Sequence, residues 1–184
     1  SALVSSGAIK LSDATKILRL RGEAMQNAVP INVGAMAALI GVEIDIIDKL
    51  RSNYVNVNEV LDIGNDNSPG QMVISGHSSV VDKVITEYKS LGIKRAIKLP
   101  VSAPFHCGLM KKAAYDMEEH LNSLEVLSPN IILINNVDAL PISDPLKIKK
   151  SLIKQITKTV RWRESVHNMC NLGVSSFIEL GAGN

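Results

Sequence analysis

The feature that most constrains the fold is the order of short apolar segments between residues 34 and 102. Four of these segments have the character of strands and two have the spacing of amphipathic helices: strands 34–41, 55–63, 71–75 and 95–101, and helices 44–52 and 78–88. The order strand, helix, strand, strand, helix, strand predicts a ferredoxin-like unit. That fold alone implies no function, but its strands lack the aromatic pairs on which RNA-reading sheets stack bases.

The sequence on either side of this unit predicts a second, larger subdomain. Four helices and two strands are expected there: helices 12–28, 109–124, one from Asp144 and one over 162–170, and strands 131–134 and 176–180. The run Ile-Ile-Leu-Ile at 131–134 is continuously apolar, as in a strand that is buried on both faces. We therefore expect an α/β-hydrolase-like subdomain of residues 1–33 and 103–184, interrupted by a ferredoxin-like subdomain of residues 34–102.

Composition excludes several classes of protein. The 184 residues are 46% hydrophobic and 21% charged, which predicts a packed core and not a disordered chain. The net charge of +2 comes from scattered Lys and Arg, which gives little reason to expect a nucleic-acid partner. Cys107 and Cys170 fit no metal-site or disulfide pattern, and no apolar run is long enough to span a bilayer. We expect a cytoplasmic protein without a metal, a cofactor or a membrane partner.

One candidate catalytic residue stands out in the segment Leu-Pro-Val-Ser-Ala-Pro-Phe-His-Cys-Gly-Leu-Met, residues 99–110. The segment leads from a predicted strand, across two prolines, to the start of a predicted helix. An imidazole can move a proton near neutral pH, so His106 is the best candidate for a general base. Taken by itself, a single histidine in a proline-rich loop is more often structural or solvent-exposed.

The same segment resembles the histidine motif of the malonyl-CoA:acyl carrier protein transacylases, the α/β acyltransferases that load malonyl groups for fatty acid synthesis. Other segments are similar to that family in the same order and at similar spacing: Arg21-Gly-Glu-Ala-Met-Gln26, Gly34-Ala-Met-Ala-Ala38, Asn67-Ser-Pro-Gly-Gln71, Asn135-Asn-Val-Asp138 and Glu179-Leu-Gly-Ala-Gly183. Each motif is moderately specific, but the series is highly specific and covers nearly the whole chain.

The resemblance implies a reaction and roles for particular residues. Malonyl would pass from malonyl-CoA to the phosphopantetheine thiol of acyl carrier protein through a seryl-enzyme intermediate. His106 would be the base, Arg21 would hold the malonyl carboxylate through two parallel hydrogen bonds, and the backbone carbonyl of Gln155 would orient His106. Met25, one helical turn after Arg21, would line the pocket. Asn136 follows a predicted strand at the end where ligands gather, although turn chemistry explains it equally well.

The resemblance also predicts that these 184 residues lack the nucleophile. In the family the nucleophile lies in Gly-His-Ser-Leu-Gly, immediately ahead of a stretch resembling Ser1-Ala-Leu-Val4. Ser5 and Ser6 are interpreted as helix residues, because an isolated serine without a strained turn and a base is not a nucleophile. The alternatives are an inactive fragment, or a non-catalytic regulatory or carrier-protein-binding module built on the ferredoxin-like part. An incomplete larger subdomain also predicts exposed apolar surface and marginal stability.

Overall fold

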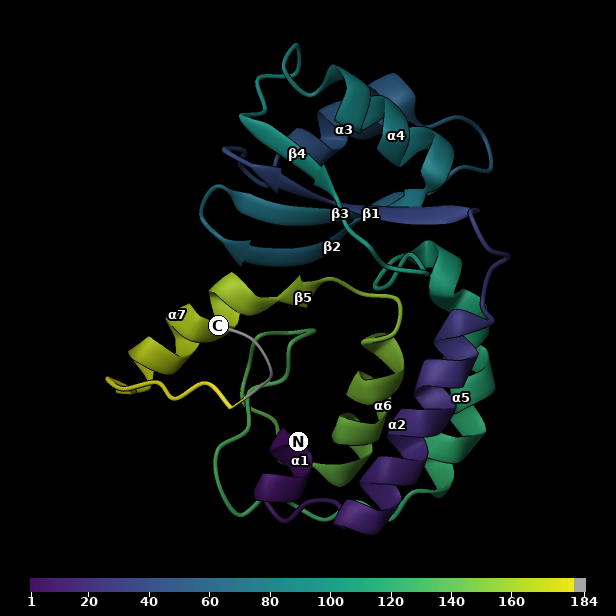
Figure 1. Cartoon of the computed structure of the whole chain (residues 1–184). Coiled ribbons are helices and arrows are strands. Elements are labelled where there is room, and N and C mark those ends of the chain that lie inside the picture. Colours follow the sequence, from purple (N-terminus) through teal and green to yellow (C-terminus); the bar gives the residue numbers. More distant parts are fainter. Residues whose placement is uncertain (181–184) are drawn as a thin grey trace.

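The architecture is mixed α/β, built around one sheet, in a computed structural model that describes residues 1–180 (Figure 1). The sheet order is β4-β1-β3-β2-β5, and the strands are β1 (Gly34–Ile40), β2 (Leu61–Ser68), β3 (Gln71–His77), β4 (Arg95–Lys98) and β5 (Val160–Arg161). The first four strands pair antiparallel with their neighbours, and only the short β5 pairs parallel, with β2. Strand β5, at residues 160–161, therefore extends a sheet that residues 34–98 form.

Two helices, α3 (Ile46–Tyr54) and α4 (Ser78–Glu87), cover one face of this sheet (Figure 1). Their apolar sides meet the inward residues of β1, β2 and β3 in one cluster, in which Leu39, Leu50 and Ile74 are completely buried. The buried residues of each helix lie three or four positions apart and so share one face: Ile47 and Leu50 in α3, and Val80, Val81 and Val84 in α4. This confirms the predicted alternation of strands and helices between residues 34 and 102.

Strand β2 begins six residues later than the sequence predicted, at Leu61 and not at Val55. Residues 55–60 form a loop instead, in which Val57 is 89% exposed. The composition of residues 65–70 is typical of a turn, but residues 65–68 continue the strand because they pair with β3, and only residues 69–70 turn. Two irregularities in that pairing accommodate these poor strand formers. Tertiary pairing has therefore overridden local propensity here.

Three further helices, α2 (Leu11–Gln26), α5 (Lys111–Ser123) and α6 (Pro145–Lys154), form the other half of the molecule (Figure 1). Helix α5 packs against both of the others, and their shared cluster contains Met25, Met117 and Ile156. Helix α6 begins where the sequence predicted, because the Asp144 carboxylate accepts a hydrogen bond of 2.8 Å from the Leu146 N–H. None of the helices in the described part of the chain has the length and apolar character that a membrane crossing requires.

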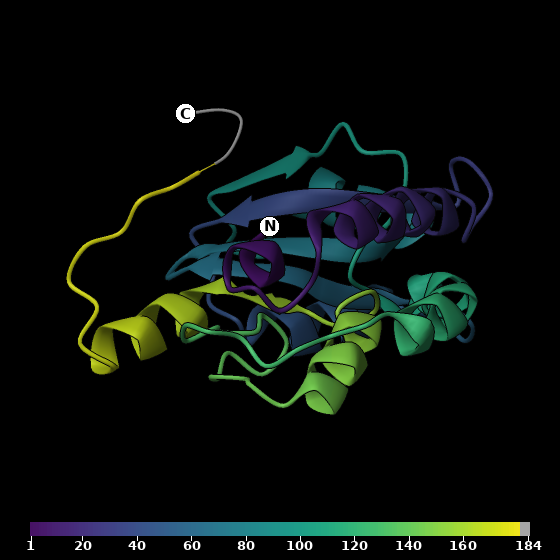
Figure 2. The same ribbon diagram turned by 90° about the horizontal axis from the view of Figure 1, so that it is seen from below.

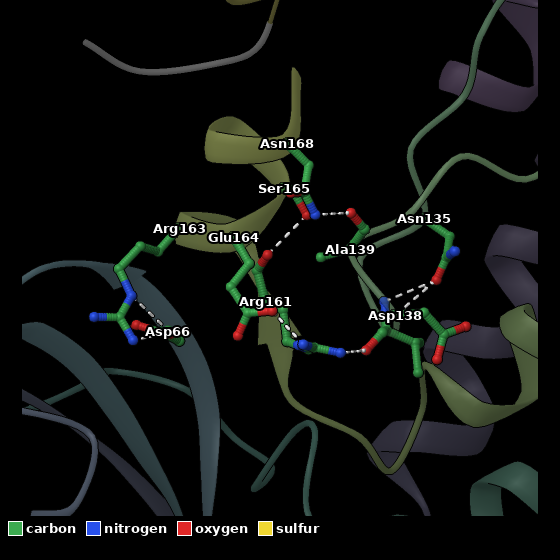
Figure 3. A network of polar contacts seen from close by, with 10 residues as sticks. Asp66, Asn135, Asp138, Ala139, Arg161, Arg163, Glu164, Ser165 and Asn168 are labelled. Atoms are coloured by element: carbon green, nitrogen blue, oxygen red, sulfur yellow. Dashed lines mark hydrogen bonds and ion pairs between the residues drawn. The ribbon is translucent and has the colours of Figure 1, made fainter. Parts of the chain in front are cut away.

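Helix α7 (Trp162–Asn171) is attached to the sheet and to the loop 135–139 by a network of polar contacts (Figure 3). Arg163 donates to the buried carboxylate of Asp66 on β2 over 2.9 Å between Nη2 and Oδ2. Toward the loop, Arg161 donates to the Val137 carbonyl and Asn168 donates to the Ala139 carbonyl. Arg161 also pairs with Glu164 within the same segment. These contacts hold α7 between the two halves of the molecule.

The two strands predicted at 131–134 and 176–180 are absent from the structure, so both predictions are wrong. Ile134 forms a single isolated bridge with Pro141, while Ile132 is 72% exposed. The segment after α7 runs along the outside of the molecule, and Ile178 is 86% exposed (Figure 2). A strand needs a neighbour to receive its hydrogen bonds, and within residues 1–180 neither segment has one beyond that bridge. The expectation of exposed apolar surface is confirmed at these two segments.

Candidate active site

The candidate base, His106, lies in the loop between β4 and the 3₁₀ turn Gly108–Met110 that leads into α5. Its φ of 59° places it in the left-handed region, which a residue with a side chain rarely adopts. For an L-residue this conformation costs about 1–2 kcal/mol. Contacts on both sides of His106 must offset that cost, and they come from distant parts of the chain.

The loop lies against the sheet at two glycines. A Cβ at Gly34 would come within 2.2 Å of the Pro104 ring, and one at Gly64 would lie 3.4 Å from the Phe105 carbonyl oxygen. Only the missing side chain at Gly34 allows Pro104 to pack there. The first strand thereby fixes the backbone two residues before His106.

The imidazole of His106 is oriented by the end of helix α6. Its Nδ1 lies 2.8 Å from the backbone oxygen of Gln155, the C-cap residue of that helix. The last carbonyls of a helix have no partner within the helix, so this oxygen is free to accept a hydrogen bond. With Nδ1–H donating to it, Nε2 carries a lone pair and can accept a proton. The contact has the geometry that the family resemblance implies for these two residues, an imidazole held at Nδ1 by a carbonyl acceptor.

The pKa of His106 lies below its ordinary value. Burial is the main cause, the positive charge of Arg21 acts in the same direction, and the backbone of Gln155 and of Lys158 opposes them. A lowered pKa keeps the imidazole neutral, and therefore basic, at neutral pH. Burial raises the pKa of the adjacent Cys107 thiol, so this cysteine is a poor candidate for a nucleophile.

Arg21 is held on α2 with part of its guanidinium buried. Its Nε has no hydrogen-bond partner among residues 1–180, and burial lowers the pKa of this group. A buried cation that lacks a partner is costly, so the position favours an anionic ligand. The positive charge of Arg21 lowers the pKa of His106, which indicates that the two side chains lie near one another.

The other predicted residues lie close to these two. The Asn136 side-chain oxygen accepts from Nε2 of Gln155 at 2.5 Å, which joins the loop 135–139 to the helix end that orients His106. Met25 is 5% exposed and packs in the helical cluster with Ala103 and Met110. It therefore lies among core side chains. In the described part of the chain, no group of three or more His, Cys, Asp or Glu side chains could hold a metal ion.

Two hollows adjoin the site. His106 lines a polar groove of about 710 Å³ between β2 and the segment 157–159, together with the charged side chains of Arg51, Asp62 and Lys158. Asn136 and Gln155 line a smaller, mainly apolar cavity of about 290 Å³ beside α2 and α6. Asp62 and Arg51 carry no signal in the sequence, because no local pattern shows that β2 lies beside a loop more than forty residues later.

Comparison with known proteins gives one consistent result, although no family model matches the chain. The malonyl CoA-acyl carrier protein transacylase of Staphylococcus aureus (strain COL) is 36% identical over 183 residues, which cover 100% of this chain and 59% of that protein. The protein of the same name from Haemophilus influenzae is 39% identical, with 100% of this chain and 58% of that protein covered. The chain therefore spans a little under three fifths of the length of these relatives.

Solved structures agree with these relatives. An acyl carrier protein S-malonyltransferase from Vibrio cholerae superposes with a TM-score of 0.90 at 46% identity, covering 94% of this chain and 56% of the other. A malonyl-transacylase solved in complex with its type II PKS acyl-carrier protein gives a TM-score of 0.90 at 37% identity, covering 94% and 56%. The resemblance predicted from the sequence motifs is confirmed in sequence and in structure.

Proposed function

Because the chain is homologous over its whole length to malonyl CoA-acyl carrier protein transacylases, we propose that it is part of an enzyme with this activity. The enzyme would transfer malonyl from malonyl-CoA to the phosphopantetheine thiol of an acyl carrier protein in fatty acid synthesis. The observation that carries the proposal is the 2.8 Å contact between His106 Nδ1 and the Gln155 carbonyl, with the positive charge of Arg21 close enough to lower the pKa of His106.

In this proposal the nucleophile is a serine outside the 184 residues. Its hydroxyl attacks the thioester carbonyl of malonyl-CoA while Nε2 of His106 accepts the hydroxyl proton. The tetrahedral intermediate expels the coenzyme A thiolate, which takes the proton from His106, and leaves a malonyl ester on the serine. The carrier-protein thiol then attacks that ester, its proton passes to His106, and the serine oxygen recovers the proton as it leaves.

Arg21 selects the acyl group in the same proposal. The malonyl carboxylate would pair with the guanidinium, whose Nε is buried without a partner among residues 1–180. An acetyl group would leave that cation unpaired, which is costly in a buried site. Met25, one helical turn after Arg21 and packed in the helical cluster, would line the pocket, and Asn136 would fix the Gln155 side chain.

The proposed function comes with a division of the fold. Residues 34–102 would form a ferredoxin-like subdomain, and residues 1–33 and 103–184 part of an α/β-hydrolase-like one. The antiparallel order β4-β1-β3-β2, with α3 and α4 on one face, supports the first assignment. We also place the protein in the cytoplasm; that Cys107 and Cys170 are both free fits a compartment where disulfides are rare.

The test is to look for the acyl-enzyme. The 184-residue chain and a longer protein that includes the preceding segment are each incubated with labelled malonyl-CoA, then examined by intact mass and peptide mapping. We expect an adduct on a serine of the longer protein, its loss in the His106→Ala variant, and no adduct on the shorter chain.

The contrary results are equally specific. An unlabelled longer protein that still binds acyl carrier protein would favour a non-catalytic binding module. An adduct on Ser5, Ser6 or Cys107 of the shorter chain that disappears with His106→Ala would identify a different nucleophile. Selectivity is tested by offering acetyl-CoA, which the Arg21→Ala variant should no longer discriminate against.

A further inference from the structure

A carboxylate from the sheet contacts the backbone of the histidine loop, whereas Gln155 contacts the imidazole ring. Asp62 lies on β2, and its Oδ2 accepts a hydrogen bond of 2.8 Å from the backbone N–H of Gly108. Gly108 is the first residue of the 3₁₀ turn that leads into α5, and its N–H has no acceptor within that helix. Asp62 therefore caps, from 46 residues away, the helix that follows His106.

Asp62 is itself held by a second side chain. Arg51 on α3 approaches Asp62 Oδ1 with Nη2 at 2.6 Å, and its Nε donates to the Leu61 carbonyl over 2.8 Å. One guanidinium thus binds both the carboxylate and the backbone next to it, and this fixes the direction of the Asp62 side chain. The two oxygens of Asp62 are divided, one for Arg51 and one for Gly108.

Asp62 does not act on the imidazole directly. Nδ1 of His106 faces Gln155, and the groups that set the pKa of His106 are Arg21 and the backbone of Gln155 and Lys158, besides burial. What Asp62 restrains is the backbone two residues beyond His106. This matters because His106 has a φ of 59°, which its own side chain disfavours.

We propose that Asp62, held by Arg51, is a positioning residue for His106. The backbone of the loop is clamped by Asp62 at Gly108, and the ring is clamped by Gln155 at Nδ1. Both clamps are needed for Nε2 to point into the groove that His106 lines. This inference rests on the proposed role of His106 as the base, and it assigns a part of the site to the sheet of residues 34–102.

The test measures the tautomer of His106 by long-range ¹H–¹⁵N NMR of the purified chain, which has four histidines. We expect a single Nδ1–H tautomer in the unchanged protein. In Asp62→Ala we expect loss of that single state and a rise of the His106 pKa toward its ordinary value. Asp62→Asn should retain much of the Nδ1–H state, because an amide oxygen can still accept from Gly108.

Two controls separate positioning from general damage. His77 Nδ1 accepts the Val60 N–H over 2.9 Å, so it holds the opposite tautomer two residues from Asp62 and reports on the integrity of this part of the sheet. Asp82→Ala removes a 2.6 Å ion pair with Lys98 in the same region and should leave His106 unchanged. Unchanged His106 in Asp62→Ala would overturn the proposal, as would a simultaneous loss of the His77 state or an Asn variant that behaves like Ala.

A kinetic test uses the longer protein, which includes the segment that precedes residue 1. If Asp62 positions the base, Asp62→Ala should lower kcat by up to about 100-fold with little change in KM, because a misplaced catalytic group affects the chemical step. An equal loss in Asp82→Ala would contradict this. The NMR result does not need malonyl transfer, so a failed transfer assay with the expected tautomer change would overturn the proposed function and leave the positioning role intact.

Discussion

The sheet region, residues 34–98, and the segments that flank it use similar apolar residues with different results. In the sheet region every strand has a neighbour, and the core residues Leu39 and Ile74 are completely buried. In the flanking part the helices pack well, but the apolar run at 131–134 lies mostly at the surface, with Ile131 61% exposed. The difference shows that an apolar sequence forms a strand only where a partner accepts its backbone hydrogen bonds.

The candidate site lies where these two regions meet. Gln155 of the flanking part binds the ring of His106, and Asp62 of the sheet binds the backbone of the same loop at Gly108. Helix α7 makes a third connection, through Arg163 and Asp66 (Figure 3). The geometry of the site therefore depends on the position of the two regions relative to each other. The following substitutions test that dependence.

The largest effect is expected from breaking the connection itself. Arg163→Ala would leave the Asp66 carboxylate, which is 4% exposed, without its ion partner. Removing one partner of such a pair costs about 3–5 kcal/mol. The free energy of unfolding measured in urea should fall by that amount, whereas Arg19→Ala, which breaks an exposed pair with Glu23, should change it by less than about 1 kcal/mol. Equal effects would mean that α7 does not join the two regions.

Truncating one apolar side chain in each region tests how differently the two regions are buried. Leu39→Ala should destabilise the chain by about 2–5 kcal/mol, because it removes a fully buried side chain and leaves a cavity. Ile132→Ala, at a position that is 72% exposed, should change stability by less than about 0.5 kcal/mol. Urea unfolding of both variants measures the contrast, and a large loss with Ile132→Ala would show that this segment is packed in solution.

A matched pair of glycine substitutions tests how the loop lies on the sheet. Gly34→Ala would place a Cβ 2.2 Å from the Pro104 ring and should cost about 1–3 kcal/mol. Gly22→Ala, in the exposed middle of α2 with no atom within 4 Å of the new Cβ, should stabilise by about 0.5–1 kcal/mol. Thermal unfolding gives the signs, and the His106 NMR signals should shift in the first variant only. A Gly34→Ala variant that is as stable as the unchanged protein, or more stable, would refute the loop packing.

The smallest effect concerns pH. Since the pKa of His106 is lowered by folding, the unfolded chain binds its proton more readily below pH of about 6.5. The contribution of His106 to stability is therefore complete above that pH and decreases as the pH falls through the window below it. Asparagine tolerates a positive φ, so His106→Asn can keep the loop conformation. Between pH 7 and pH 5 this variant should lose less unfolding free energy than the unchanged protein, because it lacks the imidazole that the unfolded chain protonates more readily. An unchanged pH profile would mean that His106 is not buried.

Much of this protein could be predicted from residue patterns that act locally. The helices were recognised because a helix forms its hydrogen bonds within one segment, and Asp144-Pro145 marks the start of α6 by its own chemistry. The alternation of strands and helices before residue 102 could be predicted from the sequence in the same way. The roles that we propose for His106, Arg21 and Gln155 came from the family resemblance, because spacing alone does not bring together a histidine and a carbonyl 49 residues apart.

Tertiary structure alone decided the rest, since it depends on which distant segments become neighbours. It made a strand of the polar residues 65–68 by pairing them with β3, and left the apolar run 131–134 outside the sheet. It placed His106 in a left-handed conformation and bound the neighbouring backbone to Asp62. Strand pairing and loop anchoring are contacts between remote residues, and a local pattern specifies only which surfaces need a partner.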